Sequence, residues 1–258
     1  MASQESPSGK WSLYGEIESE IFIAGHSHAG SVLEAKLGNV EDTILERVAI
    51  CYSSDLNSGP PGDDEYWNFV AEISKGKDLA IVWNGNQHNA NFLFQTSPPF
   101  TLVSDKSDAT DELLISRTMM KSFFEPSFQE LSSIIKSMAD VRSISLVSGP
   151  APKPFSHITN RISSEEFFVN IARSLGVDVG DLTITSDSLR VEMWTILGEL
   201  LEEAAIDLGA KYIPAPPETI DSNGLLFEKY WTPDVTHANS DYGLLLADHI
   251  SKYVSGGV

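Results

Sequence analysis

Residues 21–28 read IFIAGHSH. The first four form an unbroken apolar run, which is followed by small and polar residues. Similar apolar runs lie at 47–52, 79–83 and 144–147, and a shorter one lies at 211–213. Strands that are apolar throughout, rather than at every second residue, are typical of parallel sheets covered by helices on both faces. These five runs therefore predict five parallel strands.

Helical patterns alternate with these runs along the chain. A short helix is expected at 29–37, and apolar residues recur at about one helix turn in five later stretches, at 65–74, 128–138, 167–175, 188–208 and 242–253. The alternation predicts an α/β fold, a three-layer α/β/α sandwich whose five-stranded parallel sheet is doubly wound and flavodoxin-like. Five strands are too few for an eight-stranded barrel.

The length of 258 residues and the mass of 28.2 kDa suit one large domain. Residues 1–18 are polar and are expected to be partly disordered, so the predicted domain spans 19–258. Residues 95–125 fit the alternation poorly, because prolines, an acidic stretch and two phenylalanines follow one another there. Long loops of this kind are often functional lids, and the alternative is an ordinary surface insertion.

The composition limits the partners that the protein can have. Lys and Arg number 17 against 37 for Asp and Glu, which gives a net charge of −20. Such a surface repels nucleic acids and anionic membranes. The chain also has a single cysteine, a polar start and no apolar run of the ~20 residues that a membrane helix needs. These features lead us to expect a cytoplasmic protein with a small-molecule substrate, whereas its oligomeric state stays open.

Polar clusters follow the first three predicted strands, at 25–28, 53–64 and 84–89. In doubly wound sheets, ligands bind beyond the carboxyl ends of the strands. Ser27 stands where the first strand turns into a helix, which allows two interpretations. It is either a helix cap, a position that serine favours, or a nucleophile whose reaction is assisted by the helix N-terminus.

A nucleophilic serine needs a base and a carboxylate that orients the base. Asp234 and His237 are three residues apart near the end of the chain, so one turn can bring them to the same side. An imidazole with a pKa near ~6.5 suits a base at neutral pH. The alternatives are that Asp234 caps the last helix and that His237 is an ordinary loop residue.

Together these stretches resemble the SGNH (GDSL-type) hydrolases, and the resemblance spans nearly the whole chain. The family's G-D-S block, which carries the nucleophile, is matched at 25–27. Its N-x-G-x-S-G-D-T block is matched at 57–64 and its G-x-N-D block at 84–87. Its D-x-x-H block is matched by Asp234 and His237.

The resemblance implies a serine esterase with the triad Ser27, Asp234 and His237 and without a cofactor or metal. It implies an oxyanion hole made by the backbone of Ser27, the backbone of Gly62 and the side chain of Asn86. We prefer Gly62 over Gly59 and Asn86 over Gln87 for these roles. The substrates that it implies are small acyl esters or acylated carbohydrates.

Three departures from the family pattern are visible. His26 stands in place of the aspartate before the nucleophile, Asn84 in place of a glycine, and Gln87 in place of an aspartate. Four of the six histidines lie in the site loops, and the other two, His157 and His249, are expected at the surface. The candidates for contact with the substrate are His26, His28, His88 and Trp231.

Three alternatives share these residues. The His-x-His pattern suits a metal-dependent hydrolase, since imidazole is a common zinc or iron ligand. An O-acyltransferase would form the same acyl-enzyme and pass the acyl group to a sugar or alcohol. A non-catalytic ligand-binding or sugar-binding module on the same scaffold would explain the altered residues. Product analysis with and without an acceptor, and turnover in the presence of a chelator, distinguish these alternatives.

Overall fold

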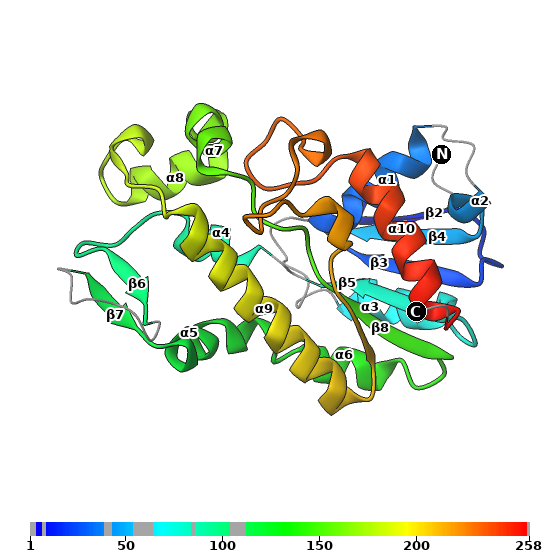
Figure 1. Ribbon diagram of the computed structural model, residues 1–258. Coiled ribbons are helices and arrows are strands. Elements are labelled where there is room, and N and C mark those ends of the chain that lie inside the picture. Colours follow the sequence, from blue (N-terminus) through cyan, green and yellow to red (C-terminus); the bar gives the residue numbers. More distant parts are fainter. Residues whose placement is uncertain are drawn as a thin grey trace.

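The computed structural model describes residues 4–6, 9–38, 43–53, 64–83, 86–103 and 112–256. A seven-stranded sheet with the order β1-β2-β4-β3-β5-β8-β9 lies at its centre (Figure 1). The strands are β1 (Gln4–Glu5), β2 (Trp11–Tyr14), β3 (Ile21–Gly25), β4 (Val48–Ser53), β5 (Asp78–Val82), β8 (Ser143–Val147) and β9 (Lys211–Ile213).

Five of these strands, β4-β3-β5-β8-β9, are parallel, which confirms the predicted parallel sheet. In chain order they are arranged 2-1-3-4-5, the flavodoxin-like order. The prediction of only five strands was wrong, because β1 and β2 add an antiparallel edge. This edge comes from the segment 1–18. Trp11 and Leu13 are buried, while the alternate residues Ser12 and Tyr14 are half-buried, so four residues suffice to pair with β4.

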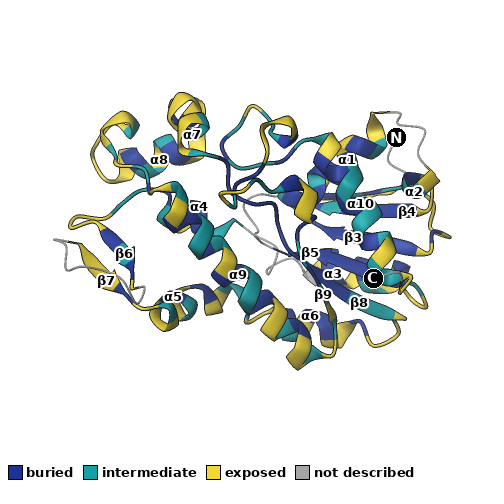
Figure 2. Cartoon of the chain, viewed as in Figure 1, coloured by how far each residue is buried: buried dark blue, intermediate teal, exposed yellow. Residues whose placement is uncertain are grey.

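Helices cover both faces of the sheet. On one face α1 (Gly30–Leu37) packs against α10 (Ser240–Val254), and a Cβ atom on Gly243 would lie 2.0 Å from the Ser31 carbonyl oxygen. On the other face lie α3 (Asp64–Ile73), α6 (Leu131–Ser137) and the end of α9 (Asp187–Leu208). A short helix, α2 (Thr43–Glu46), precedes β4. Alternate residues of each central strand face the two layers, so the strands are buried throughout (Figure 2).

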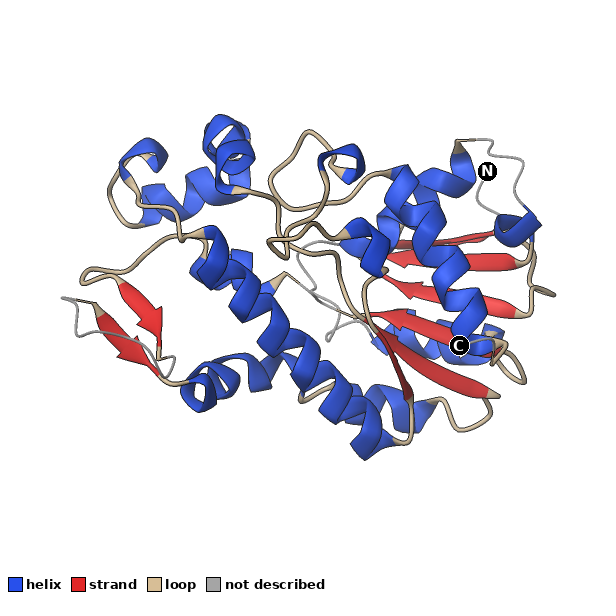
Figure 3. Ribbon diagram, viewed as in Figure 1, coloured by secondary structure: helices blue, strands red, loops and turns tan. Residues whose placement is uncertain are grey.

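A mostly helical part of the chain extends beyond the carboxyl ends of the strands (Figure 3). It holds the expected insertion 95–125, in which β6 (Phe100–Leu102) pairs with β7 (Leu113–Ile115) and α5 (Arg117–Phe124) follows. These elements pack on α9 through their own apolar cluster. A further cluster joins the residues that directly follow α4 (Gln87–Phe92) to α7 (Phe155–Arg161) and α8 (Glu166–Ser174).

The longest helix, α9, runs from the sheet into this second part (Figure 1). Its start is capped by Ser186, whose hydroxyl accepts the N–H of Leu189, and its end by Gly209 in the left-handed conformation with φ 68°. Across the described ranges, no helix is both long enough and apolar enough to cross a membrane.

Candidate functional site

The candidate site lies where β3 and β5 end. These two strands are neighbours, although the 52 residues 26–77 lie between the end of β3 and the start of β5. In the order 2-1-3-4-5 the connections leave toward opposite faces of the sheet at this position, which opens a crevice. The residues that follow the two strands, Ser27 and Asn86, are therefore brought to the same end of the sheet.

The turn after β3 is fixed by a glycine and a tyrosine. A Cβ atom on Gly25 would lie 2.7 Å from the Val82 carbonyl oxygen of β5, so only glycine allows this approach. The buried hydroxyl of Tyr66, on α3, accepts the Gly25 N–H at 2.7 Å. The same hydroxyl donates to the Cys51 carbonyl oxygen at 2.7 Å, with the Gly25 carbonyl oxygen at 3.1 Å. Tyr66 thus ties the ends of β3 and β4 together directly below the turn.

Replacement of Tyr66 by phenylalanine is expected to destabilise the protein. It leaves a buried N–H and a buried carbonyl without their partner, which costs about 1–3 kcal/mol of unfolding free energy. The matched control is Tyr242→Phe, because the buried Tyr242 hydroxyl has no hydrogen-bond partner within the described part of the chain. Urea unfolding of the two variants measures the difference, and equal losses in both would contradict this role of Tyr66.

Ser27 is the first residue of a 3-10 turn, η1 (Ser27–Ala29), that leads straight into α1. The residue at the cap of η1 is His26, and the residue at the cap of α1 is Ala29. Ser27 is therefore not the capping residue of either helix, which removes the simplest alternative to a nucleophile. The N–H groups of Ala29 and Gly30 donate to the His26 carbonyl oxygen, at 2.9 and 3.3 Å. The N–H of Ser27 precedes these two groups in the chain. Like the other N–H groups at the start of a helix, it has no acceptor inside the helix.

Asp234 and His237 form a hydrogen-bonded pair. Oδ2 of Asp234 lies 3.0 Å from Nδ1 of His237, while Oδ1 accepts the backbone N–H groups of Thr236 and His237 at 2.8 and 2.7 Å. Burial alone would raise the pKa of Asp234. The bonds from His237 and the nearby Lys153 ammonium outweigh burial and hold the pKa well below its usual range. Asn239, rather than Asp234, caps α10.

Trp231 lies at the base of this loop. Its indole N–H donates to the Leu226 carbonyl oxygen at 2.8 Å, and its ring lies 4.7 Å from the ring of His157. An isolated bridge joins Trp231 to Ala238, which closes the loop that carries the acid–histidine pair. These contacts give Trp231 a structural role in the loop, and its contact with substrate stays a prediction.

Three other histidines, His26, His88 and His237, lie close enough to His28 to influence its pKa. The His28 ring is 7% exposed and lies 5.6 Å, centroid to centroid, from the His237 ring. Burial, followed by the proximity of His237 and His88, lowers the pKa of His28 to about 3. His28 is therefore a neutral imidazole at physiological pH. The buried His88 of α4 and, to a lesser extent, His26 contribute to this lowering.

This gathering of histidines lacks the arrangement of a metal site. Where the structure describes the chain, no group of three or more His, Cys, Asp or Glu side chains could hold a metal ion. The His-x-His pattern at 26–28 therefore brings the His28 ring close to His237 without forming a ligand set from the described residues.

Asn86 precedes α4 and occupies its N-cap position. Its Oδ1 accepts a hydrogen bond from Nδ2 of Asn89 at 2.8 Å, which fixes the amide and leaves Nδ2 as the group that can donate. The alternative residue, Gln87, is the first residue of α4. The predicted Gly62 and its alternative Gly59 lie outside the described residues, as do positions 84 and 85.

Comparison with known proteins gives matches only among solved structures. No protein-family model matches the chain, and no curated protein matches it. A Streptococcus pneumoniae protein described as a platelet activating factor is 13% identical with a TM-score of 0.51, over 92% of this chain and 84% of that one. A Bacteroides fragilis protein described as an acylhydrolase is 9% identical with a TM-score of 0.50, over 94% and 90%. A GDSL-like lipase from Bacteroides thetaiotaomicron is 9% identical with a TM-score of 0.49, over 92% and 88%.

The chain shares the fold of the first two of these proteins. At these identities the similarity concerns the fold alone. The roles of Ser27, Asn86, Asp234 and His237 therefore depend on the geometry of this chain.

Two residues that contact the loop carrying Asp234 and His237 could not be assigned this role from the sequence. Nζ of Lys153, in the segment after β8, donates to the Asp234 carbonyl oxygen at 2.6 Å, and Nε2 of His157 lies 2.8 Å from the same oxygen. His157 is thus no ordinary surface residue. The one sequence signal for Lys153 is that it is the single charged residue in the proline-rich stretch GPAPKPF at 149–155. A lysine is buried in such a stretch only where its charge has a partner.

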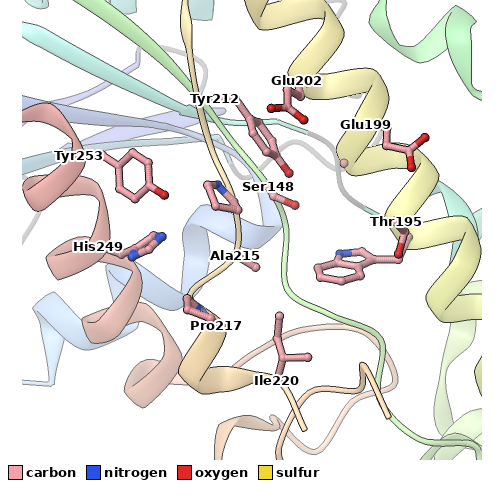
Figure 4. A pocket seen from close by; sticks show the side chains of 13 residues that line it. Ser148, Thr195, Glu199, Glu202, Tyr212, Ala215, Pro217, Ile220, His249 and Tyr253 are labelled. Carbon is pink, nitrogen blue, oxygen red and sulfur yellow. The ribbon is translucent and has the colours of Figure 1, made fainter. Parts of the chain in front are cut away.

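A cavity of about 470 Å³ lies elsewhere in the molecule, over the edge strand β9 between α9 and α10 (Figure 4). Its wall includes Ser148, Tyr212, His249 and Tyr253, and none of the predicted site residues lines it. His249 was expected at the surface and instead faces this cavity (Figure 4). The cavity is therefore separate from the candidate site at the ends of β3 and β5.

Proposed function

We propose that the protein is a serine hydrolase that cleaves an ester or related acyl bond of a small molecule or acylated sugar through an acyl-enzyme. One observation carries this proposal. The Asp234–His237 pair from the end of the chain lies against the turn after β3, where the His28 ring, one residue from Ser27, is 5.6 Å from the His237 ring. A hydroxyl, an imidazole and a carboxylate gathered at one strand end are the groups that acyl transfer needs.

The reaction begins when Oγ of Ser27 attacks the carbonyl carbon and its proton passes to Nε2 of His237. Asp234 accepts the Nδ1–H of the ring and stabilises the imidazolium. When the tetrahedral intermediate collapses, the bond to the leaving oxygen breaks and His237 returns the proton to the departing alcohol. Water then attacks the acyl-enzyme with His237 as base, which releases the acid and restores Ser27.

Negative charge develops on the carbonyl oxygen during both steps. The proposed donors are the N–H of Ser27, the N–H of Gly62 and Nδ2 of Asn86, which come from three strand ends. The fixed amide of Asn86, with its oxygen held by Asn89, supports this role. Donors oriented before the reaction stabilise the transition state because they need no reorganisation.

Asn86→Ala is expected to lower kcat by about 100- to 1000-fold, the usual effect of removing one oxyanion donor. KM should change much less, because the donor acts on charge that exists only in the transition state. Asn91→Ala, on the exposed side of the same short helix, is the matched control. Steady-state kinetics on an aryl ester measure both variants. Similar kcat values for Asn86→Ala and Asn91→Ala would remove Asn86 from the oxyanion hole.

The neighbouring histidines are proposed to shape the same site. His28 packs against His237 and, with a pKa of about 3, stays neutral when His237 takes the proton. A second cation at that distance would oppose formation of the imidazolium. His26, in the turn after β3, and His88, in the first turn of α4, are proposed to contact the polar part of the substrate.

Turnover of a short-chain aryl ester, with products followed over time, tests the proposed function. We expect the acid to form in water, and a chelator to leave the rate unchanged because the proposed chemistry uses no metal. Parallel reactions with a sugar or alcohol acceptor identify a transferase if the acylated acceptor forms in place of the acid. Failure to turn over any of a series of esters would contradict the proposal and favour a binding module.

A further inference from the structure

We propose that Lys153 is a positioning residue for the candidate catalytic loop: its buried ammonium group fixes the backbone that presents Asp234 and His237. This inference rests on the proposed function and deepens it, since it names the group that holds the acid–base pair in place. Lys153 lies outside every motif that the sequence analysis matched.

The contacts of the ammonium group reach both ends of the loop. Nζ donates to the Thr232 carbonyl oxygen at 3.0 Å, to Oγ1 of Thr232 at 3.1 Å and to the Asp234 carbonyl oxygen at 2.6 Å. These three shorter bonds match the three hydrogens of an ammonium group, and a fourth acceptor, Oδ1 of Asp234, lies farther away at 3.5 Å. Oγ1 of Thr232 in turn donates to the His237 carbonyl oxygen at 2.7 Å. One side chain therefore connects directly to Thr232 and Asp234, and through Thr232 to His237.

Lys153 also stabilises the charge of the acid. Oδ1 of Asp234 lies 3.5 Å from Nζ, and the same oxygen accepts the N–H groups of Thr236 and His237. The other carboxylate oxygen, Oδ2, faces the His237 ring. Oδ1 of Asp234 therefore interacts with the loop backbone and with Lys153, whereas Oδ2 interacts with the imidazole of His237.

The backbone of Lys153 is itself held by the start of α9. The fully buried Arg190 donates from Nη1 to the Lys153 carbonyl oxygen at 2.7 Å and from Nε to the Thr185 carbonyl oxygen at 3.2 Å. Its other terminal nitrogen pairs with Asp187, which accepts the N–H of Phe155 at 2.7 Å. The ammonium is therefore supported from a rigid helix.

Stability alone does not explain a charge in this position. The Lys153 side chain is 1% exposed, and removing an ammonium from water costs more than a well-packed apolar side chain would. A methionine would fill a similar volume without that cost. Methionine could not make the hydrogen bonds to Thr232 and Asp234. The ammonium group is therefore needed to hold the conformation of the loop.

The protonation of Lys153 gives this role a signature. Burial lowers its pKa to about 8, against the opposing effect of Asp234 and of the more distant Glu165. The other charged or titratable groups nearby are Arg190, on the Lys153 carbonyl, and His157, on the Asp234 carbonyl. Above pH 8 the amine keeps two hydrogens for three acceptors, and its attraction to Asp234 ends. We therefore expect kcat to fall as the pH rises through about 8.

Unfolding has the opposite dependence, which separates the two effects. The unfolded chain holds this proton up to a pKa of about 10.5, whereas the folded chain releases it near 8. Between these values the unfolded state binds more protons, so the contribution of Lys153 to the unfolding free energy rises with pH. A fall in kcat above pH 8 is thus not a consequence of lost stability at this residue.

The test compares Lys153→Met with Lys36→Met. Lys36, on α1, is a matched control because it is half-buried and donates to two backbone carbonyls, of Leu45 and Val48, at 2.5 and 2.7 Å. Lys153→Met is expected to lower kcat by about 100-fold, the effect of a small misplacement of catalytic groups, with KM little changed. Lys36→Met should leave kcat unchanged. Lys153→Arg keeps a cation at all accessible pH values and should remove the decline near pH 8.

A second measurement does not depend on turnover. Hydrogen exchange of the Thr236 and His237 backbone amides reports whether the loop is held, and it should accelerate in Lys153→Met but not in Lys36→Met. If Ser27→Ala retained full activity, the proposed function would fail while the exchange rates still tested Lys153. Wild-type exchange at these amides in Lys153→Met would overturn the inference. A decline in kcat at the same pH in Lys153→Arg as in the wild type would also overturn it.

Discussion

Ser27→Ala is expected to lose about 10⁴- to 10⁶-fold in kcat on a short-chain aryl ester, the range found when a nucleophile or its partner is removed from a catalytic triad. The loss follows because the substitution removes the Oγ that attacks the carbonyl carbon. KM should change little, since the hydroxyl of Ser27 is small and contributes mainly to the transition state. Initial rates of the wild type and the variant at the same enzyme concentration measure the effect.

The control for this loss is Ser148→Ala. Ser148 directly follows β8 as Ser27 closely follows β3, but it faces the cavity over β9. A variant at this position should keep the wild-type rate. If Ser27→Ala retained turnover comparable to that of Ser148→Ala, Ser27 would not be the nucleophile, and the interpretation of the turn after β3 would have to change.

His237→Ala is expected to cause a loss of similar size. Without the imidazole, Ser27 has no base for its proton, and Asp234 has no ring to hold. Because the two residues act in one step, the double variant Ser27→Ala/His237→Ala should be about as slow as either single variant. Kinetics of the three variants with one aryl ester test this non-additivity.

The matched control here is His249→Ala, which removes a partly buried histidine at the cavity over β9. Losses that multiply in the double variant would mean that Ser27 and His237 act independently. That result would contradict a shared proton transfer, even if each single variant were slow.

Most of the sheet could be predicted from the sequence because its central strands are apolar on both faces. The runs at 21–24 and 79–83 contain no polar residue, so neither a two-residue alternation nor a helical period competes with the interpretation as buried strands. The edge strands could not be predicted in the same way. β2 buries only Trp11 and Leu13 and is surrounded by polar residues, so its four-residue alternation is indistinguishable from a polar terminus.

The pairing of Asp234 with His237 was predictable from their spacing, because a single turn decides it. The spacing could not decide between this pairing and a helix cap, and the structure does so by placing Asn239 at the start of α10. Similarly, Ser27 fits both a cap and a nucleophile by sequence. Its place inside η1 is decided by the bonds of the His26 carbonyl.

The supports of the site could not be predicted, because they act through backbone groups far away in the chain. Tyr66 bonds to Gly25, 41 residues earlier, and Lys153 bonds to Asp234, 81 residues later. Backbone carbonyls and N–H groups occur at every residue, so such contacts leave no pattern in the sequence. The same reasoning explains why His157, bonded to the Asp234 carbonyl, looked like a surface residue.

Labelling with an active-site-directed fluorophosphonate, followed by peptide mass spectrometry, tests most directly whether Ser27 is the group that becomes acylated. The reagent transfers its phosphonyl group to an activated serine and loses fluoride. We predict a single adduct on the peptide that contains Ser27, formed in the wild type and strongly slowed in His237→Ala. An adduct on another serine, or labelling of Ser27 that is equally fast without His237, would contradict the proposed catalytic site.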